Sequence, residues 1–166
     1  MAYANRLSLR HLWMTVLCVP VLFLSSCSSA SKGPGGTISK VKTYHLIPTE
    51  RIRTSDRAIP FERHYRLRGS GTAAEQRERA GHYYAFLWKV HDRTRPVTVK
   101  FQYRQANSGR DTTVVTQEVA DVGRSNWTKF QVTGQPYHKL GRVTAWKLTL
   151  ERDGEVLASQ QSYLWE

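Results

Sequence analysis

The sequence is poor in cysteine, and this limits its chemistry. Only Cys18 and Cys27 occur among the 166 residues. The chain after Cys27 therefore has no thiol, which excludes an internal disulfide, a cysteine nucleophile and a cysteine-ligated zinc ion from that part. It must be stabilised by its own hydrophobic core, for which about 100 residues are enough.

Acidic residues and long apolar runs are missing from the first part of the chain. No Asp or Glu occurs before Glu50, and Arg6 and Arg10 precede an apolar run of 13 residues, 12–24. A membrane-spanning helix needs about 20 apolar residues, so this run is too short to cross a membrane. A basic stretch followed by a short apolar run is typical of an export signal. We expect residues 1–26 to be a signal peptide in a helical conformation.

The apolar run ends in Leu24-Ser25-Ser26-Cys27. This motif resembles the lipobox of bacterial lipoproteins, and the resemblance covers the first 27 residues. It implies that Cys27 is lipidated with acyl chains such as palmitate and that the chain is cut just before it. The alternative is an ordinary signal peptide that is cut after Ala30, with Cys27 discarded.

Small residues and glycine follow Cys27. Their composition is typical of a flexible linker, so we predict a lipidated cysteine and linker over residues 27–37. Ser28 stands where enteric lipoproteins of the inner membrane commonly carry aspartate. The resemblance therefore implies a protein of the bacterial cell envelope that is sorted to the outer membrane.

From Ile38 onward, apolar and polar residues alternate with the period of two that half-buried strands show. Asp153-Gly154 predicts a two-residue turn between the last two strands, because glycine accommodates a positive φ. Thr72-Ala73-Ala74-Glu75 matches a capping box and predicts a short helix near residues 73–80. After the first strand, the predicted strands cover residues 61–68, 84–90, 97–103, 114–119, 127–132, 143–152 and 155–165.

This succession predicts an all-β fold. Seven or eight short antiparallel strands, each with one apolar face, indicate a β-sandwich over residues 38–166. The order is similar to that of an immunoglobulin or fibronectin type III domain, although the Cys–Trp–Cys pattern of true immunoglobulin domains is absent. A small barrel is the alternative architecture.

No grouping of side chains indicates an enzyme. The five histidines after Cys27 lack the spacing of a metal site, and Ser70 does not lie in a nucleophile motif. The aspartates fall in predicted turns, where they usually bind backbone N–H groups. We therefore expect no catalytic residue, no metal site and no cofactor, but a binding or scaffolding module.

Positive charge is the most distinctive feature of the composition. The net charge is +12, and residues 32–68 carry nine basic and three acidic residues. Beside a lipid anchor, this excess predicts contact with anionic lipid headgroups or another envelope protein. Nucleic acid is not expected, because an exported protein rarely meets it and no nucleic-acid motif is present. The candidate residues are Arg51, Arg53, Arg57, Arg63, Arg66 and Arg68.

Aromatic residues indicate an alternative function. Five of them are in phase with the apolar strand faces and are predicted to lie in the core: Trp88, Phe101, Tyr103, Phe130 and Trp146. Four are less well placed and could form a platform for a sugar: Tyr83, Tyr137, Tyr163 and Trp165. On that interpretation the protein is a carbohydrate-binding or hydrolase-accessory module.

Overall fold

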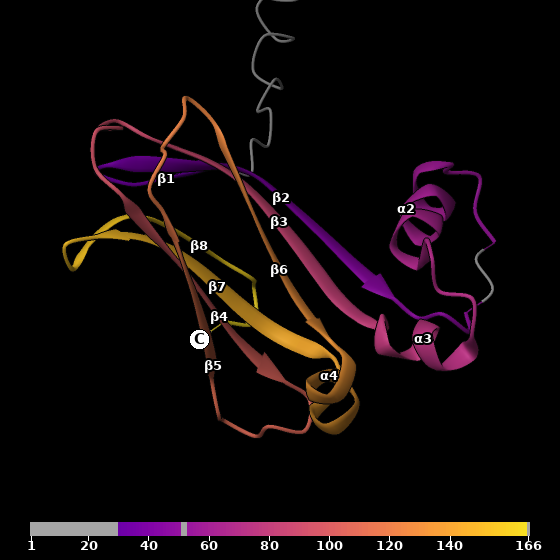
Figure 1. Cartoon of the computed structure of the whole chain (residues 1–166). Coiled ribbons are helices and arrows are strands. Elements are labelled where there is room, and N and C mark those ends of the chain that lie inside the picture. The colour runs from indigo at the N-terminus through magenta and orange to yellow at the C-terminus, as the bar shows by residue number, and fades with distance from the viewer. Residues whose placement is uncertain (1–29, 51–52, 166) are drawn as a thin grey trace, which may run out of the picture.

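The computed structural model describes residues 30–50 and 53–165, which contain two antiparallel sheets (Figure 1). Sheet A has the strand order β1-β2-β3-β6, and sheet B has the order β5-β4-β7-β8. The strands of sheet A are β1 (Ser31–Lys32), β2 (Gly36–Leu46), β3 (Gly81–Val90) and β6 (Asn126–Thr133). Those of sheet B are β4 (Val97–Gln105), β5 (Thr113–Val119), β7 (Val143–Arg152) and β8 (Glu155–Gln161).

The core forms from the inward side chains of both sheets, as the alternation predicts. Phe86 and Trp88 of β3 and Phe101 of β4 are fully buried, and the rings of Phe86 and Phe101 lie 5.7 Å apart. Trp146 differs from the expectation because it is only partly buried against this core. The predicted all-β sandwich is confirmed, with eight strands in two separate sheets.

Two local predictions are also confirmed. Asp153 and Gly154 have φ angles of 50° and 84°, the positive values that a type I′ hairpin turn requires. Thr72 caps helix α3 (Ala73–Glu78), since its side chain accepts from the Glu75 N–H at 3.2 Å. The Glu75 carboxylate accepts from the Thr72 N–H at 3.0 Å and completes the capping box.

The predicted strand over residues 61–68 is wrong, because this segment lies in helix α2 (Ala58–Leu67). Phe61 and Tyr65 are four residues apart, a spacing that fits both a strand and one turn of a helix. Pro60 lies in the first turn, where proline is tolerated because its missing N–H has no helical partner. Glu62 and Arg66 form an ion pair at 3.4 Å, which the helix allows by placing them on neighbouring turns.

Helix α4 (Gly134–Leu140) has no counterpart in the sequence expectations. It connects β6 of sheet A to β7 of sheet B and lies at one end of the sandwich (Figure 1). Its first residue, Gly134, has a φ of 62°, a backbone conformation that side chains with a Cβ rarely adopt. The glycine lets the chain turn sharply out of β6 into the helix.

Part of the predicted linker over residues 27–37 belongs to the sandwich. Ser31 and Lys32 pair with β2, and the Gly35 N–H donates to the Leu157 carbonyl oxygen at 3.1 Å. A Cβ at Gly33 would lie 2.3 Å from the same oxygen. Glycine is needed here because the chain passes against the backbone of β8, not because it must stay flexible. Residues 1–29, with the predicted signal peptide and Cys27, lie outside the described residues.

Gly33→Ala tests this packing of the chain against β8. We expect the free energy of unfolding to fall by about 1–3 kcal/mol, because the new methyl group collides with the Leu157 backbone. Urea denaturation measures the effect. Gly123→Ala is the matched control, since its nearest neighbour would lie 3.5 Å away. Equal stability of the two variants would contradict the packing.

Candidate anionic-surface binding site

The three long strands of sheet A contain no acidic residue. Alternate side chains of β3 and β6, such as Phe86, Trp88 and Phe130, are buried between the sheets. The other set must point outward, because successive side chains of a strand face opposite ways. Four lysines on this outer face are exposed: Lys40, Lys42, Lys89 and Lys129.

The strand register arranges these outer side chains in rows across sheet A. One row is Lys40, Leu87 and Trp127, and the next is Lys42, Ala85 and Lys129. Neighbouring strands are about 4.8 Å apart, so a row of three spans about 10 Å. The middle residue of each row is apolar, so basic and aromatic side chains border Ala85 and Leu87 of β3, and Lys89 of the same strand follows on this face.

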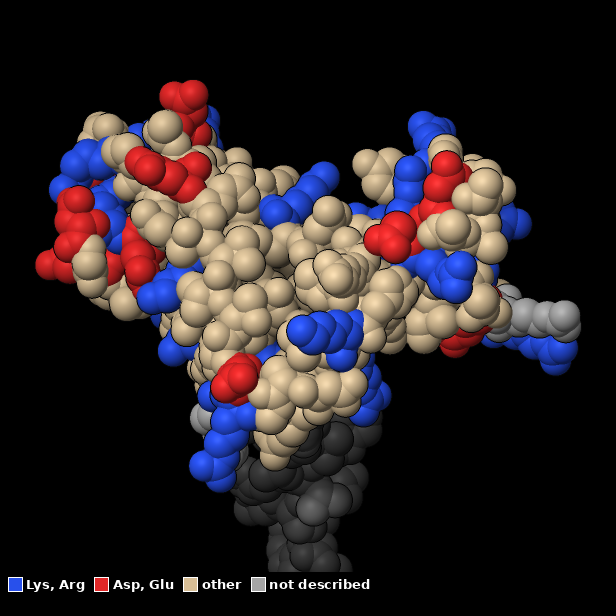
Figure 2. Space-filling model, turned by 60° about the horizontal axis from the view of Figure 1, so that its bottom comes forward, with Lys and Arg blue, Asp and Glu red and all other residues tan. Residues whose placement is uncertain are grey.

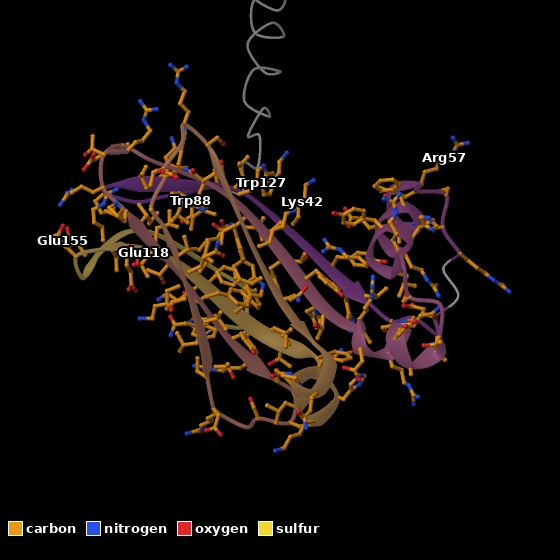
Figure 3. All side chains as sticks on the ribbon, viewed as in Figure 1. Lys42, Arg57, Trp88, Glu118, Trp127 and Glu155 are labelled. Atoms are coloured by element: carbon orange, nitrogen blue, oxygen red, sulfur yellow. The ribbon has the colours of Figure 1, made fainter. Side chains whose placement is uncertain are left out.

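Trp127 is the aromatic component of this face. Its side chain is 46% exposed, and the Lys42 Nζ lies 5.6 Å from the ring centroid. Figure 3 shows Lys42 and Trp127 together on sheet A, and Glu118 and Glu155 at the far end of the molecule. An exposed indole among ammonium groups suits a surface that is both anionic and partly apolar. We call Trp127 with the four exposed lysines the lysine face.

Sheet B has a different charge pattern. Its strands carry Glu118, Glu151 and Glu155 beside four basic residues. Two turn aspartates, Asp92 and Asp153, are both bound by Arg95, at 3.2 Å and 2.9 Å. In Figure 2, which brings the lower side of the molecule forward, a group of acidic side chains lies at the upper left, others lie on the lobe at the right, and the middle is mostly uncharged. Of the two sheets, only sheet A therefore has no acidic residue in its described strands.

Asp92 has a structural role, as the turn prediction expected. The Thr94 hydroxyl and N–H donate to its Oδ1 at 2.6 Å and 2.9 Å, and these bonds hold the pKa of Asp92 well below its usual range. Arg152 is buried and reaches Asp92 Oδ2 at 3.2 Å. Its guanidinium also donates to the Asp92 and Pro96 carbonyls, which fixes the loop between β3 and β4.

Two of the predicted binding arginines are used inside the protein. Arg63 donates to the carbonyl oxygens of Pro48 and Glu50. The Arg66 guanidinium lies 4.2 Å from the centroid of the buried Tyr83 ring and pairs with Glu62. Arg63 thus binds the segment after β2, and Arg66 contacts Tyr83 of β3. Both guanidiniums have partners inside the protein, and their binding to an anionic surface stays a prediction.

Three of the four remaining predicted arginines are described by the structure, and all three are exposed. Arg53, Arg57 and Arg68 are exposed, and Figure 3 shows Arg57 projecting away from the sandwich. Arg51 lies outside the described residues. The exposed arginines flank α2 and do not belong to the lysine face.

A histidine pair lies at the end of the sandwich. His45 and His82 are cross-strand neighbours whose rings stack 4.0 Å apart, and the Tyr137 hydroxyl lies 2.8 Å from His45 Nε2. Burial, with smaller contributions from His45 and Arg142, lowers the pKa of His82 to about 4. Among the described residues, no group of three His, Cys, Asp or Glu side chains could hold a metal ion.

The four candidate platform aromatics differ in their surroundings. Tyr83 is buried beneath Arg66 of α2, and Tyr137 contacts the histidine pair. Tyr163 is 96% exposed beyond β8, and the Arg104 guanidinium covers the Trp165 ring at 4.6 Å. Tyr83 and Tyr137 thus have partners inside the protein, whereas Tyr163 and Trp165 both follow β8. A sugar platform among these aromatics stays a prediction.

Comparisons with known proteins add little to this geometry. No family model matches the sequence, and no curated protein matches it. A crystal structure of a protein from Akkermansia muciniphila is similar at 15% identity and a TM-score of 0.42, covering 76% of this chain and 69% of that one. Within the described residues, no helix is long and apolar enough to cross a membrane.

The pKa of His82 predicts how stability depends on pH. Its value of about 4 in the folded state lies below the ordinary 6.5, so the unfolded chain binds more protons between these two values. We expect the free energy of unfolding to fall by about 1–2 kcal/mol from this group between pH 7 and pH 4.5.

His82→Phe, which keeps an aromatic ring beside His45, tests this dependence by denaturation at a series of pH values. It should show a shallower loss of stability with acid than the wild type. The control His91→Phe changes an exposed histidine and should keep the wild-type slope. The same slope in His82→Phe and His91→Phe would contradict the assignment.

Proposed function

We propose that this protein is an exported, lipid-anchored, non-enzymatic binding module whose lysine face contacts an anionic surface of the cell envelope. The observation that carries the proposal is the outer face of sheet A, whose strands contain no acidic residue and expose four lysines and Trp127. The lipobox resemblance at Cys27 supports the anchor and a location in the outer membrane.

The size of the electrostatic attraction explains why the proposal needs both the lysine face and the lipid anchor. A lysine close to an anionic surface contributes about 1 kcal/mol, so four contribute about 4 kcal/mol, equivalent to a dissociation constant in the millimolar range. That is too weak to recruit a dilute protein. It is enough to orient a protein that acyl chains already hold at the membrane.

Charge reversal on the lysine face tests the binding surface. We expect Lys42→Glu with Lys129→Glu to weaken binding of residues 28–166 to phosphatidylglycerol vesicles by at least about 30-fold at low salt. Vesicle sedimentation measures the affinity, and added salt should abolish wild-type binding because it screens the charges.

The matched control for this variant reverses two exposed basic residues elsewhere, Arg110→Glu with Lys139→Glu. It changes the net charge by the same amount and should bind almost as the wild type does. Equal weakening by both double variants would mean that only net charge matters and would contradict a defined face.

Fatty-acid labelling of cells tests the anchor. We expect the wild-type protein to incorporate an alkyne analogue of palmitate and Cys27→Ser to incorporate none, because the acyl chains attach at Cys27. In-gel detection after click chemistry gives the result. An unlabelled wild type, or label retained by Cys27→Ser, would show that the anchor is wrong.

A further inference from the structure

Helix α2 exposes an aromatic stripe that the packing of the sandwich does not explain. Phe61 is 67% exposed and Tyr65 is 53% exposed. They are four residues apart in the helix and therefore lie on the same side of it. α2 has no buried residue, so this helix does not use its apolar side chains to pack on the sandwich.

Polar contacts of the opposite side hold the helix in place. Arg63 donates to the carbonyls of Pro48 and Glu50, and Arg66 lies over the Tyr83 ring. Arg79 donates to the Arg66 carbonyl oxygen at 3.0 Å and so fixes the last turn of α2 to the segment after α3. The Arg66 guanidinium also lies 5.7 Å from the centroid of the Tyr65 ring, which borders these contacts. Phe61 is about 200° around the helix from Arg63 and therefore faces away from the segment that Arg63 binds. α2 and α3 form a lobe beside the sandwich (Figures 1 and 2).

The charges near the stripe are positive. Arg57 and Arg68, the cap residues of α2, are exposed; Arg57 is four residues before Phe61 and Arg68 is three after Tyr65, so both lie near the aromatic rings. The two acids of this segment are engaged elsewhere: Asp56 accepts from the Ala58 N–H at 2.9 Å, and Glu62 pairs with Arg66. Exposed aromatics flanked by basic residues are typical of helices that lie in a membrane interface among anionic lipids.

The position of Ser31 brings the outer face of sheet A close to the proposed anchor at Cys27. Cys27 precedes Ser31 by four residues, which span at most about 14 Å, and Ser31 is paired with Ile38 on the edge of sheet A. Lys40, two residues further along β2, stands in the same row as Trp127. The sandwich is thus tethered by the edge of the sheet whose outer face carries both the lysine face and α2.

We infer that α2 lies on an anionic phospholipid bilayer, with Phe61 and Tyr65 at the boundary of headgroups and acyl chains. Arg57 and Arg68 then meet lipid phosphates, and the lysine face contacts the same bilayer. The inference rests on the proposed function and names its surface: the membrane that holds the lipid anchor.

Photocrosslinking of the full chain tests the inference. p-Benzoylphenylalanine replaces Phe61 in protein reconstituted into vesicles of phosphatidylethanolamine and phosphatidylglycerol. After illumination, trypsin releases residues 58–63, and mass spectrometry detects lipid attached to this peptide. The matched control carries the same amino acid in place of Tyr163, an exposed aromatic residue beyond β8 of sheet B. A third sample carries p-benzoylphenylalanine in place of Trp127.

We expect position 61 to give at least about fivefold more lipid adduct than position 163, and more in anionic vesicles than in phosphatidylcholine vesicles. Equal adducts at 61 and 163 would overturn the inference. Adducts at 127 but not at 61 would remove the role of α2 and leave the lysine face at the membrane. Adducts at neither 61 nor 127 would overturn both proposals.

Discussion

The register of β3 against its two neighbours decides which side chains face the core and which face outward. Trp88 is buried in that register, where its Nε1–H donates to the Thr128 hydroxyl at 2.9 Å, also inside the core. A slip of one residue would leave this indole N–H unpaired and would turn lysines such as Lys129 into the core. The buried pair therefore also keeps the basic side chains of sheet A together on its outer face.

Three features follow from this arrangement. The glycines before β2 let the chain pass against the Leu157 backbone, so the segment from Ser31 onward belongs to the sandwich. Arg66 of α2 contacts Tyr83 of sheet A and Arg63 binds the segment after β2, while Phe61 and Tyr65 stay exposed. The acids of the strands are confined to sheet B. Together they give the molecule one side suited to an anionic membrane and another that is mixed in charge.

The sandwich could be predicted from the sequence because apolar and polar residues alternate within each strand. The Asp153-Gly154 turn could be predicted because it contains the glycine that such a turn requires. The lysine face could not, because its residues lie on three strands that the sequence separates by up to 89 positions, Lys40 to Lys129. Only the register brings them together. Charge alone does not distinguish a free guanidinium from one bound to carbonyl oxygens or an aromatic ring, so the partners of Arg63 and Arg66 could not be predicted from the sequence. The spacing of Phe61 and Tyr65 fits two periods, so α2 was predicted as a strand.

Lysine footprinting of the full chain in anionic vesicles tests most directly whether sheet A faces the membrane. An amine-reactive reagent is added to the vesicles, and mass spectrometry compares each lysine with the same protein in neutral detergent. The account predicts that Lys40, Lys42, Lys89 and Lys129 are protected in vesicles, whereas Lys139 of α4, which is exposed and lies at the end of the sandwich, stays reactive. Equal reactivity of all five lysines in vesicles and in detergent would contradict it.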